Sequence, residues 1–302
     1  MASNTTQVWT IGSLLTWTAD FFVRKGIEEP RLSSELLLAH CLKCSRMALY
    51  TQYEKIPPED QLTAFRELVK QRAAHVPVAY LIGKAWFFSL EFMVTRDVLI
   101  PRPDTETLVE KVISHVRQKP SWTNNAGTPA ILDLCTGSGC IAIVLAKHLP
   151  TATIVATDLS EKALEVARKN AAEHQVADRI TFLQGDLYAA LARETVPALF
   201  HVIASNPPYI PTADIANIAA QVRDHEPRGA LDGGLDGLDF HRRIVEGAPG
   251  LLQAVGILIQ EMQFDQGPGL SAAFSVSGRL TGVRTIRDAA GHPRCVVASR
   301  VG

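Results

Sequence analysis

Groups suited to binding a planar amino group stand together in the stretch Ser205-Asn-Pro-Pro-Tyr-Ile. Pro207 and Pro208 lack a backbone N–H and have a fixed φ, so the turn is stiff and its carbonyls remain free to accept hydrogen bonds. The Asn206 side-chain carbonyl and the Pro207 backbone carbonyl can accept the two hydrogens of an NH₂ group, and the Tyr209 ring can stack on its plane. A lone Pro-Pro pair would indicate only a turn after a strand. The asparagine before it and the tyrosine after it favour a substrate site.

A second candidate binding site is the glycine-containing turn Asp133-Leu-Cys-Thr-Gly-Ser-Gly. Gly137 and Gly139 permit a sharp turn and let the backbone lie against a ligand without a Cβ in the way. Ala142 stands where a dinucleotide fingerprint would have its third glycine, which argues softly against that class. No Gly-Lys-Ser/Thr follows, so a phosphate P-loop is excluded more firmly.

Acidic residues follow three successive predicted strands. Asp133 begins the glycine-containing turn, Asp158 ends the second strand and Asp186 ends the third. The Asp158 carboxylate can accept both hydroxyls of a ribose, and Asp186 could meet an adenine amino group. Each acid alone could be a helix N-cap or a solvated turn residue. The three acids together with the glycines make S-adenosylmethionine the leading cofactor.

The two regions together predict methyl transfer to nitrogen. An amide or arylamine nitrogen is a poor nucleophile because its lone pair is delocalised, so holding it in line with the sulfonium methyl group lowers the entropic barrier. The two carbonyls also stabilise the positive charge that develops on nitrogen. We therefore predict Asn206, Pro207 and Tyr209 to be catalytic, and we expect no metal ion and no covalent intermediate.

The elements that must position these residues alternate between strand and helix. The first eighty residues predict helices, one of them capped by Ser33 and Ser34, and short strands near residues 86–95 predict a hairpin. After residue 130, strands are predicted at 131–134, 153–157, 180–184, 200–204, 256–260, 283–286 and 294–299, with helices at 140–148, 160–174 and 238–252. This order is typical of a mostly parallel sheet with helices on both faces, whose ligands bind outside the carboxyl ends of the strands.

Composition narrows the class of protein further. The 302 residues are 47% hydrophobic and 20% charged, an ordinary globular balance that excludes disordered and coiled-coil chains. The formal charge of −1 provides no basic field to attract nucleic acid, and no apolar run is long enough to span a bilayer. Five cysteines without a secretory leader predict reduced thiols and a cytoplasmic location. We expect a monomer with no membrane contact and no direct nucleic-acid binding.

Motifs spread over almost the whole chain resemble one known family. They are Pro77-Val-Ala-Tyr-Leu-Ile-Gly, Phe88 with Phe92, Leu99-Ile-Pro-Arg-Pro-Asp-Thr-Glu, the Asp133 turn, Asn206-Pro-Pro-Tyr and Val283-Arg-Thr-Ile-Arg-Asp-Ala-Ala-Gly. They resemble the HemK/PrmC family, the protein-(glutamine-N5) methyltransferases that modify peptide-chain release factors. The resemblance implies a class I S-adenosylmethionine-dependent methyltransferase fold, an α/β fold with a seven-stranded, mostly parallel sheet, its last strand antiparallel, and a small N-terminal helical domain. We accordingly expect a substrate-docking domain at residues 1–76, a β-hairpin linker at 77–100 and the methyltransferase domain at 101–302.

The resemblance also implies roles for individual residues. S-adenosylmethionine, which becomes S-adenosylhomocysteine, would be bound by Cys135, Thr136, Gly137, Ser138, Gly139, Asp158, Leu187 and Asn206. The glutamine of the release-factor Gly-Gly-Gln motif would be held by Asn206, Pro207, Pro208 and Tyr209. The family usually has glycine at position 135 and often an aromatic residue at position 187, so Cys135 and Leu187 depart from its pattern.

Other functions remain open on sequence grounds. A sister group that methylates a ribosomal protein shares Cys-Thr-Gly-Ser-Gly-Cys, but the motif at residues 101–106 and the chain's ending are more similar to the release-factor group. A DNA adenine-N6 methyltransferase would also bind a planar NH₂ group, but it must flip a base and usually needs a basic surface. Residues 1–80 carry nine Lys or Arg and eight Asp or Glu, which argues against that surface. A cofactor-binding module without catalysis is a third alternative, and the role of the loop at 211–237 is undecided.

Overall fold

The computed structural model describes residues 8–119, 122, 128–193 and 196–301. The chain forms two compact units, one of residues 1–84 with 219–225 and the other of residues 85–218 with 226–302. The first seven residues and the last residue, which the predicted domains include, lie outside the described part. The functional boundaries at residues 76 and 100 stay predictions.

The smaller unit is helical, as predicted. Its helices are α1 (Ile11–Arg24), α2 (Pro30–Leu42), α3 (Arg46–Thr51), α4 (Glu59–Ala73), α5 (Val78–Ile82) and α10 (Ala220–Arg223). Apolar side chains from α1, α2 and α4 form its core, with Leu15, Phe22, Leu37 and Phe65 almost completely buried. Burying each such side chain contributes about 1.5–3 kcal/mol to the free energy of unfolding.

The predicted cap of the second helix is wrong. Helix α2 begins at Pro30, whose fixed φ suits the first helical position, and Ser33 and Ser34 lie buried inside the helix. The Ser34 hydroxyl donates to the Pro30 carbonyl instead of accepting from a free backbone N–H. A proline start therefore replaces the serine cap.

The larger unit contains a hairpin and a sheet. The hairpin strands are β1 (Lys84–Phe87) and β2 (Leu90–Met93), and the sheet strands are β3 (Ala130–Leu134), β4 (Thr153–Asp158), β5 (Ile180–Gln184), β6 (Phe200–Ser205), β7 (Leu252–Glu261), β8 (Leu280–Arg287) and β9 (Pro293–Arg300). Within the described residues, the seven-stranded sheet has the order β5-β4-β3-β6-β7-β9-β8. Strand β9 runs antiparallel to both of its neighbours, which confirms the expected antiparallel last strand.

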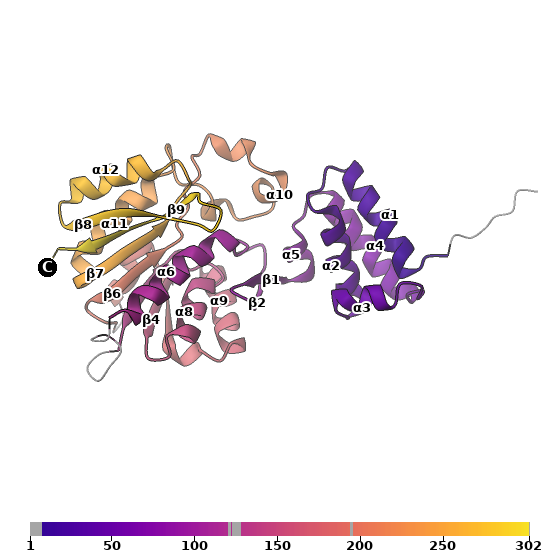
Figure 1. Ribbon diagram of the computed structural model, residues 1–302, viewed down its shortest axis with the longest axis horizontal. Helices are drawn as coiled ribbons and strands as arrows, with labels where there is room; N and C mark the ends of the chain where they lie inside the picture. The colour runs from indigo at the N-terminus through magenta and orange to yellow at the C-terminus, as the bar shows by residue number, and fades with distance from the viewer. Residues whose placement is uncertain (1–7, 120–121, 123–127, 194–195, 302) are drawn as a thin grey trace, which may run out of the picture. The chain divides into compact units, whose positions relative to one another are not determined.

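Helices cover both faces of this sheet (Figure 1). One face packs against α6 (Glu106–Arg117), α8 (Cys140–His148) and α9 (Glu161–Glu173). The other packs against α11 (Asp239–Leu251) and α12 (Gly267–Ser277). Because both faces are covered, the central strands are continuous apolar runs, and every residue of β3 and β6 is buried. The predicted fold class is confirmed.

The order of the strands brings the two regions of chemical interest together. The chain moves from β3 outward to β4 and β5, then returns to place β6 on the other side of β3. Ligands bind at the point where the order of a parallel sheet reverses. Leu134 pairs with Ser205 at the ends of β3 and β6, and the Ser205 hydroxyl donates to the Leu134 carbonyl at 2.9 Å. The segments that follow these two residues therefore leave the sheet side by side.

Four of the described helices, α3, α5, α10 and α12, do not follow from the sequence patterns. Helices α3 and α5 are short, and α12 has the sequence Gly-Pro-Gly-Leu-Ser-Ala-Ala-Phe-Ser-Val-Ser, which is rich in glycine and serine. Its buried Leu270 and Phe274 pack against the sheet, so tertiary packing outweighs weak helix propensity. No helix in the described ranges is long and apolar enough to cross a membrane.

Candidate active site

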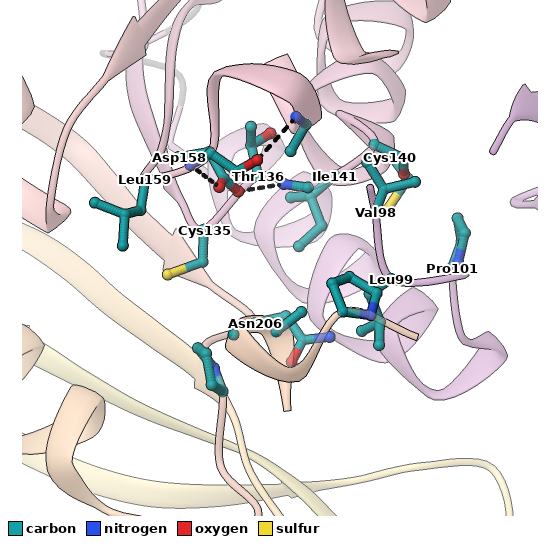
Figure 2. Close-up of a pocket in the computed structure, with 18 of the residues that line it drawn as sticks. Val98, Leu99, Pro101, Cys135, Thr136, Cys140, Ile141, Asp158, Leu159 and Asn206 are labelled. Carbon is teal, nitrogen blue, oxygen red and sulfur yellow. Dashed lines mark hydrogen bonds between the residues drawn. The ribbon is translucent and has the colours of Figure 1, made fainter. Parts of the chain in front are cut away.

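A cavity opens at the carboxyl ends of β3, β4 and β6, where the sheet order reverses. It encloses about 1060 Å³ of space, part of it open to solvent. Figure 2 shows Asp158, Thr136 and Cys135 on one side of the cavity and Asn206 on the other. The lining also includes Asp97, Val98, Leu99, Pro101, Arg102, Thr105, Gly137, Ser138, Cys140, Ile141, Leu159, Ser160, Ala163, Pro208, Pro227, Gly229, Ala230 and Phe240.

The glycine turn, residues 135–139, connects β3 to α8, and its backbone conformation determines its shape. Cys135, Gly137 and Gly139 all have left-handed backbones, with φ of 60°, 55° and 82°. A Cβ on Gly139 would lie 3.0 Å from the Ala167 Cβ of α9, so glycine there permits close packing of the two helices. A Cβ on Gly137 would have no neighbour within 4 Å, which leaves its backbone open to the cavity. Cys135 takes the conformation that favours glycine although it has a side chain.

Asp158, at the end of β4, is tied to this turn. Its two carboxylate oxygens accept hydrogen bonds from the Gly137 and Ser160 backbone N–H groups, each at 2.9 Å. Burial raises the pKa of Asp158, while hydrogen bonds from Ser160 and Gly137 oppose that rise. Each oxygen keeps a second lone pair, so the carboxylate can still accept ligand hydroxyls in the cavity that it lines.

Asp133 lies behind the glycine turn instead of in the cavity. It is completely buried in β3, and its Oδ2 accepts a hydrogen bond from the Thr136 hydroxyl at 2.6 Å. Burial raises the pKa of Asp133 to about 7, and the Thr136 hydrogen bond acts in the opposite direction. Asp133 therefore supports the turn from behind.

The acid after the third strand is placed differently from the other two. Asp186 is half exposed, and its carboxylate accepts a hydrogen bond from Arg243 of α11 at 2.6 Å. Neither Asp186 nor its neighbour Leu187 is among the residues that line the cavity. Leu187 is 6% exposed and has a left-handed φ of 50°. Their cofactor roles stay predictions.

The Asn-Pro-Pro-Tyr loop, residues 206–209, faces the glycine turn. Asn206 and Pro208 line the cavity, while Pro207 is buried and does not line it. The Asn206 Nδ2 donates to the Thr105 hydroxyl at 3.1 Å, which directs the side-chain nitrogen toward Thr105. The Tyr209 hydroxyl donates to Glu261 Oε1 at 3.3 Å.

A glutamine side chain holds the end of this loop. Gln266 Nε2 donates to the Tyr209 carbonyl at 2.8 Å and to the Gly237 carbonyl at 3.2 Å. A Cβ on Gly237 would lie 2.3 Å from the Tyr209 carbonyl oxygen, so only glycine allows this close approach. Gly237, the last residue of the loop at 211–237, is thereby packed directly against Tyr209.

The motif at residues 101–106 connects the site to distant segments. Thr105 accepts from Asn206, and the Glu106 carboxylate accepts from the Phe88 N–H at 2.7 Å in the hairpin turn. Phe88 and Ser89 both have positive φ, as a two-residue hairpin turn with matching twist requires. Glu106 therefore holds the hairpin, while Thr105 holds the Asn-Pro-Pro-Tyr loop.

The two other polar residues of this motif form ion pairs. Arg102 donates to Glu226 Oε1 at 2.6 Å, and Glu226 Oε2 accepts from the Ile100 N–H at 3.1 Å. Asp104 pairs with Arg294 of β9 at 3.0 Å, and Arg294 also pairs with Asp288 at 3.1 Å. Thr105, Glu261 and Arg294 have no local signal in the sequence, because their partners are more than fifty residues away or in another motif.

Known protein families and known proteins match most of this chain. The PrmC N-terminal domain matches residues 13–83, and the methyltransferase small domain matches residues 114–225. The chain is 41% identical to the release factor glutamine methyltransferase of Rhodopirellula baltica, over 95% of each chain. It is also 41% identical to that of Geobacter sulfurreducens, over 98% of each. A methyltransferase structure from Pyrococcus furiosus, 18% identical, matches 77% of this chain and 100% of its own with a TM-score of 0.51, a likeness of fold alone.

Proposed function

The chain belongs to the release factor glutamine methyltransferase family, and from this premise we propose that it methylates the glutamine of the Gly-Gly-Gln motif in peptide-chain release factors. The methyl group is transferred from S-adenosylmethionine to the side-chain amide nitrogen. The substrate site is the Asn-Pro-Pro-Tyr loop, and the cofactor site is the glycine turn with Asp158.

One hydrogen bond direction carries this proposal. Because the Asn206 Nδ2 donates to Thr105 at 3.1 Å, the side-chain oxygen Oδ1 remains as the end that a ligand can approach. An exposed carbonyl oxygen selects a ligand that donates hydrogen bonds, as a primary amide does. We propose that the carbonyl of neighbouring Pro207, a residue outside the cavity lining, is the second acceptor for the two N–H bonds of that amide.

These groups favour reaction at an otherwise unreactive nitrogen. Asn206 and Pro207 fix the amide group in the plane and at the place from which its nitrogen can attack. The same two oxygens stabilise the positive charge on nitrogen, which is larger in the transition state than in the ground state. Tyr209 is held at its hydroxyl by Glu261 and at its carbonyl by Gln266, and its proposed role is to stack its ring on the amide plane.

The residues around the glycine turn fit S-adenosylmethionine. Gly137 leaves its backbone open to the cavity, and Asp158 keeps acceptor capacity for ribose hydroxyls. Cys135, Thr136 and Ser138 line the same side. S-adenosylmethionine supplies an electrophilic methyl group on sulfur, and the chain supplies binding and orientation.

We further propose that residues 1–76 dock the release factor. Seven large apolar side chains of the described residues in this part are exposed, among them Trp17 at 45%, Met47 at 75% and Tyr50 at 47%. Exposed aromatic and methionine side chains are enriched where proteins bind other proteins. A Trp17→Ala variant is expected to raise the KM for a release factor while leaving that for a short Gly-Gly-Gln peptide unchanged.

The proposed function is tested by methyl transfer from labelled S-adenosylmethionine. A release factor, its Gly-Gly-Ala variant, a ribosomal protein and duplex DNA are offered in parallel. The expected result is label on the release factor and none on the Gly-Gly-Ala variant. Label on the ribosomal protein alone or on DNA alone would reject the proposed substrate.

A further inference from the structure

Glu226 is a buried carboxylate that joins two distant segments of the larger unit. Its side chain is 1% exposed, and its Oε1 accepts a hydrogen bond from the Arg102 guanidinium at 2.6 Å. Its Oε2 accepts from the Ile100 backbone N–H at 3.1 Å. A buried carboxylate is costly unless it is paired and hydrogen-bonded, and both oxygens of Glu226 meet that condition. Glu226 thereby ties together segments that are 124 positions apart in the sequence.

Both of these segments form part of the cavity wall. The cavity-lining residues next to Glu226 or in the segment that it contacts are Leu99, Pro101, Arg102, Pro227, Gly229 and Ala230. Figure 2 shows Leu99 and Pro101 on the side of the cavity away from Cys135. Glu226 is absent from the described residues that line the cavity, so its carboxylate acts through the two segments that it joins.

The second segment, residues 227–230, is attached at both of its ends. Beyond its far end, the Ile210 N–H donates to the Leu231 carbonyl at 2.9 Å, and the Gly233 N–H donates to the Ile210 carbonyl at 2.8 Å. These backbone bonds attach it to the chain just after the Asn-Pro-Pro-Tyr loop. At its near end, the attachment to residues 100–102 is made by the Glu226 side chain. A single substitution at position 226 can therefore release one end of the segment and leave the other in place.

The same carboxylate also holds the cationic group of the wall. Among the described residues that line the cavity, Arg102 is the only lysine or arginine, and its side chain is 33% exposed. A free arginine side chain occupies many rotamers, and the bond to Glu226 restricts them. Loss of the Glu226 carboxylate would therefore loosen both the wall segment and the position of the Arg102 charge.

We propose that Glu226 is a positioning residue for the cofactor: by joining residues 100–102 to residues 227–230, it holds two segments of the cavity wall around S-adenosylmethionine and slows release of the bound ligand. This inference rests on the proposed function for the identity of the ligand. It adds to the glycine turn and Asp158 a residue that does not touch the cofactor but on which its retention depends.

Release of labelled S-adenosylhomocysteine from the full chain into excess unlabelled ligand tests the proposal. Glu226→Met removes both acceptor oxygens and is expected to raise the dissociation rate on the order of 10-fold, the lower end of what a hydrogen bond to a charged group contributes. The association rate is expected to change little, because affinity differences between related complexes lie mainly in dissociation. Glu226→Gln keeps one acceptor oxygen, which can serve Arg102 or Ile100 but not both, and is expected to have an intermediate rate.

The matched control is Glu35→Met in the smaller unit. Glu35 is also a carboxylate bonded to arginines, with 3% of its side chain exposed and Arg31 and Arg46 at 2.8 and 2.6 Å. The same replacement there removes a buried, paired carboxylate without changing the cavity wall. It is expected to lower the thermal midpoint and leave the dissociation rate at the wild-type value. Equal increases in Glu35→Met and Glu226→Met would assign the effect to general loss of stability and overturn the proposal.

Hydrogen exchange at the Ile100 backbone N–H, followed by NMR, needs no ligand. This N–H is expected to exchange slowly in the wild-type chain and in Glu35→Met, and on the order of 10-fold faster or more in Glu226→Met. Glu226→Gln has the shape of the wild-type side chain and carries the test if Glu226→Met does not fold.

Two results would overturn the proposal: a wild-type dissociation rate in the folded Glu226 variants, or unchanged exchange at Ile100 in Glu226→Met. Failure of the wild-type chain to bind S-adenosylhomocysteine would overturn it together with the cofactor assignment. Faster release from the Glu226 variants, in a wild-type chain that methylates no release factor, would support the proposal and reject the proposed substrate alone.

Discussion

The glycine turn and the Asn-Pro-Pro-Tyr loop leave adjacent strands of one sheet, but they are held in place in different ways. The turn is fixed by backbone geometry: its positive φ angles, the Thr136 N–H bonded to the Thr157 carbonyl at 3.0 Å, and the Gly137 N–H bonded to Asp158. The loop is fixed by side chains from distant segments, with Asn206 on Thr105, and Tyr209 on Glu261 and Gln266.

The difference follows from what each region binds. S-adenosylmethionine has the same structure in every reaction cycle, so backbone groups can supply most of its binding contacts. Replacing one small side chain of the turn by another leaves those backbone groups in place. A substrate amide must be oriented to within a fraction of an ångström at the moment of reaction, and only specific side chains provide that. We therefore expect single side-chain changes to have their largest effects in the loop.

The largest effect is expected from Asn206→Ala. It removes an acceptor that stabilises charge in the transition state, so kcat should fall on the order of 1000-fold, as for loss of a comparable oxyanion-hole group. Single-turnover transfer to a release factor measures this, and calorimetric titration of S-adenosylhomocysteine is the control for cofactor binding. A loss of less than tenfold in kcat would contradict the assigned role.

The next largest effect is a change of stability with pH, caused by one buried carboxyl group beside each of the two regions. The pKa of Asp133 and that of Glu261 are each raised to about 7 by burial, from ordinary values of 3.8 and 4.5. An acid with a raised folded-state pKa binds its proton more tightly when folded, so its contribution to stability is greatest below the unfolded pKa. That contribution is lost as the pH rises toward 7.

For Glu261 the contribution to the free energy of unfolding should fall by about 3 kcal/mol between about pH 4.5 and about pH 8, since each pKa unit corresponds to about 1.4 kcal/mol. Urea unfolding of the wild-type chain and Glu261→Met at these two pH values measures it. The variant should gain stability relative to the wild type at the higher pH. A stability difference that is the same at both pH values would show that Glu261 ionises normally.

Asp158→Asn is expected to weaken cofactor binding by about 10- to 100-fold, the usual value of a hydrogen bond to a charged group, and to change kcat at saturation little. Asp186→Asn is the matched comparison, since it removes the corresponding charge after the next strand. Because Asp186 is paired with Arg243, its variant should have the smaller effect on the Kd for S-adenosylhomocysteine. Equal effects of the two variants would support the predicted adenine contact of Asp186.

The smallest effect is expected from Cys135→Gly. A non-glycine residue at φ 60° costs about 1–2 kcal/mol, and part of this is offset by the apolar contact that the Cys135 side chain makes with the core. Glycine should raise the free energy of unfolding by about 1 kcal/mol and leave cofactor affinity unchanged or improved. Gly139→Ala, which places a Cβ against Ala167, should change stability in the opposite direction. A destabilised Cys135→Gly protein would mean that the side-chain contact outweighs the backbone strain.

The same contrast explains what the sequence could predict. The glycine turn, the position of Asp158 at a strand end and the alternation of strands and helices follow from local patterns, because each is set by neighbouring residues or by the rules of parallel sheets. The ties of the Asn-Pro-Pro-Tyr loop do not: Thr105 and Asn206 are 101 positions apart, and Tyr209 and Glu261 are 52 apart. A glutamate at the end of a strand predicts solvent exposure, and only tertiary structure shows that Glu261 is buried.

The proposed methyl transfer depends on how the substrate amide binds to the Asn-Pro-Pro-Tyr loop. A crystal structure of the chain with S-adenosylhomocysteine and a Gly-Gly-Gln peptide tests this most directly. We predict that the glutamine nitrogen donates to Asn206 Oδ1 and to the Pro207 carbonyl, each at about 3 Å, while Asn206 Nδ2 stays on Thr105. A glutamine bound through its oxygen to Asn206 Nδ2, or one that lies outside the loop, would contradict the account.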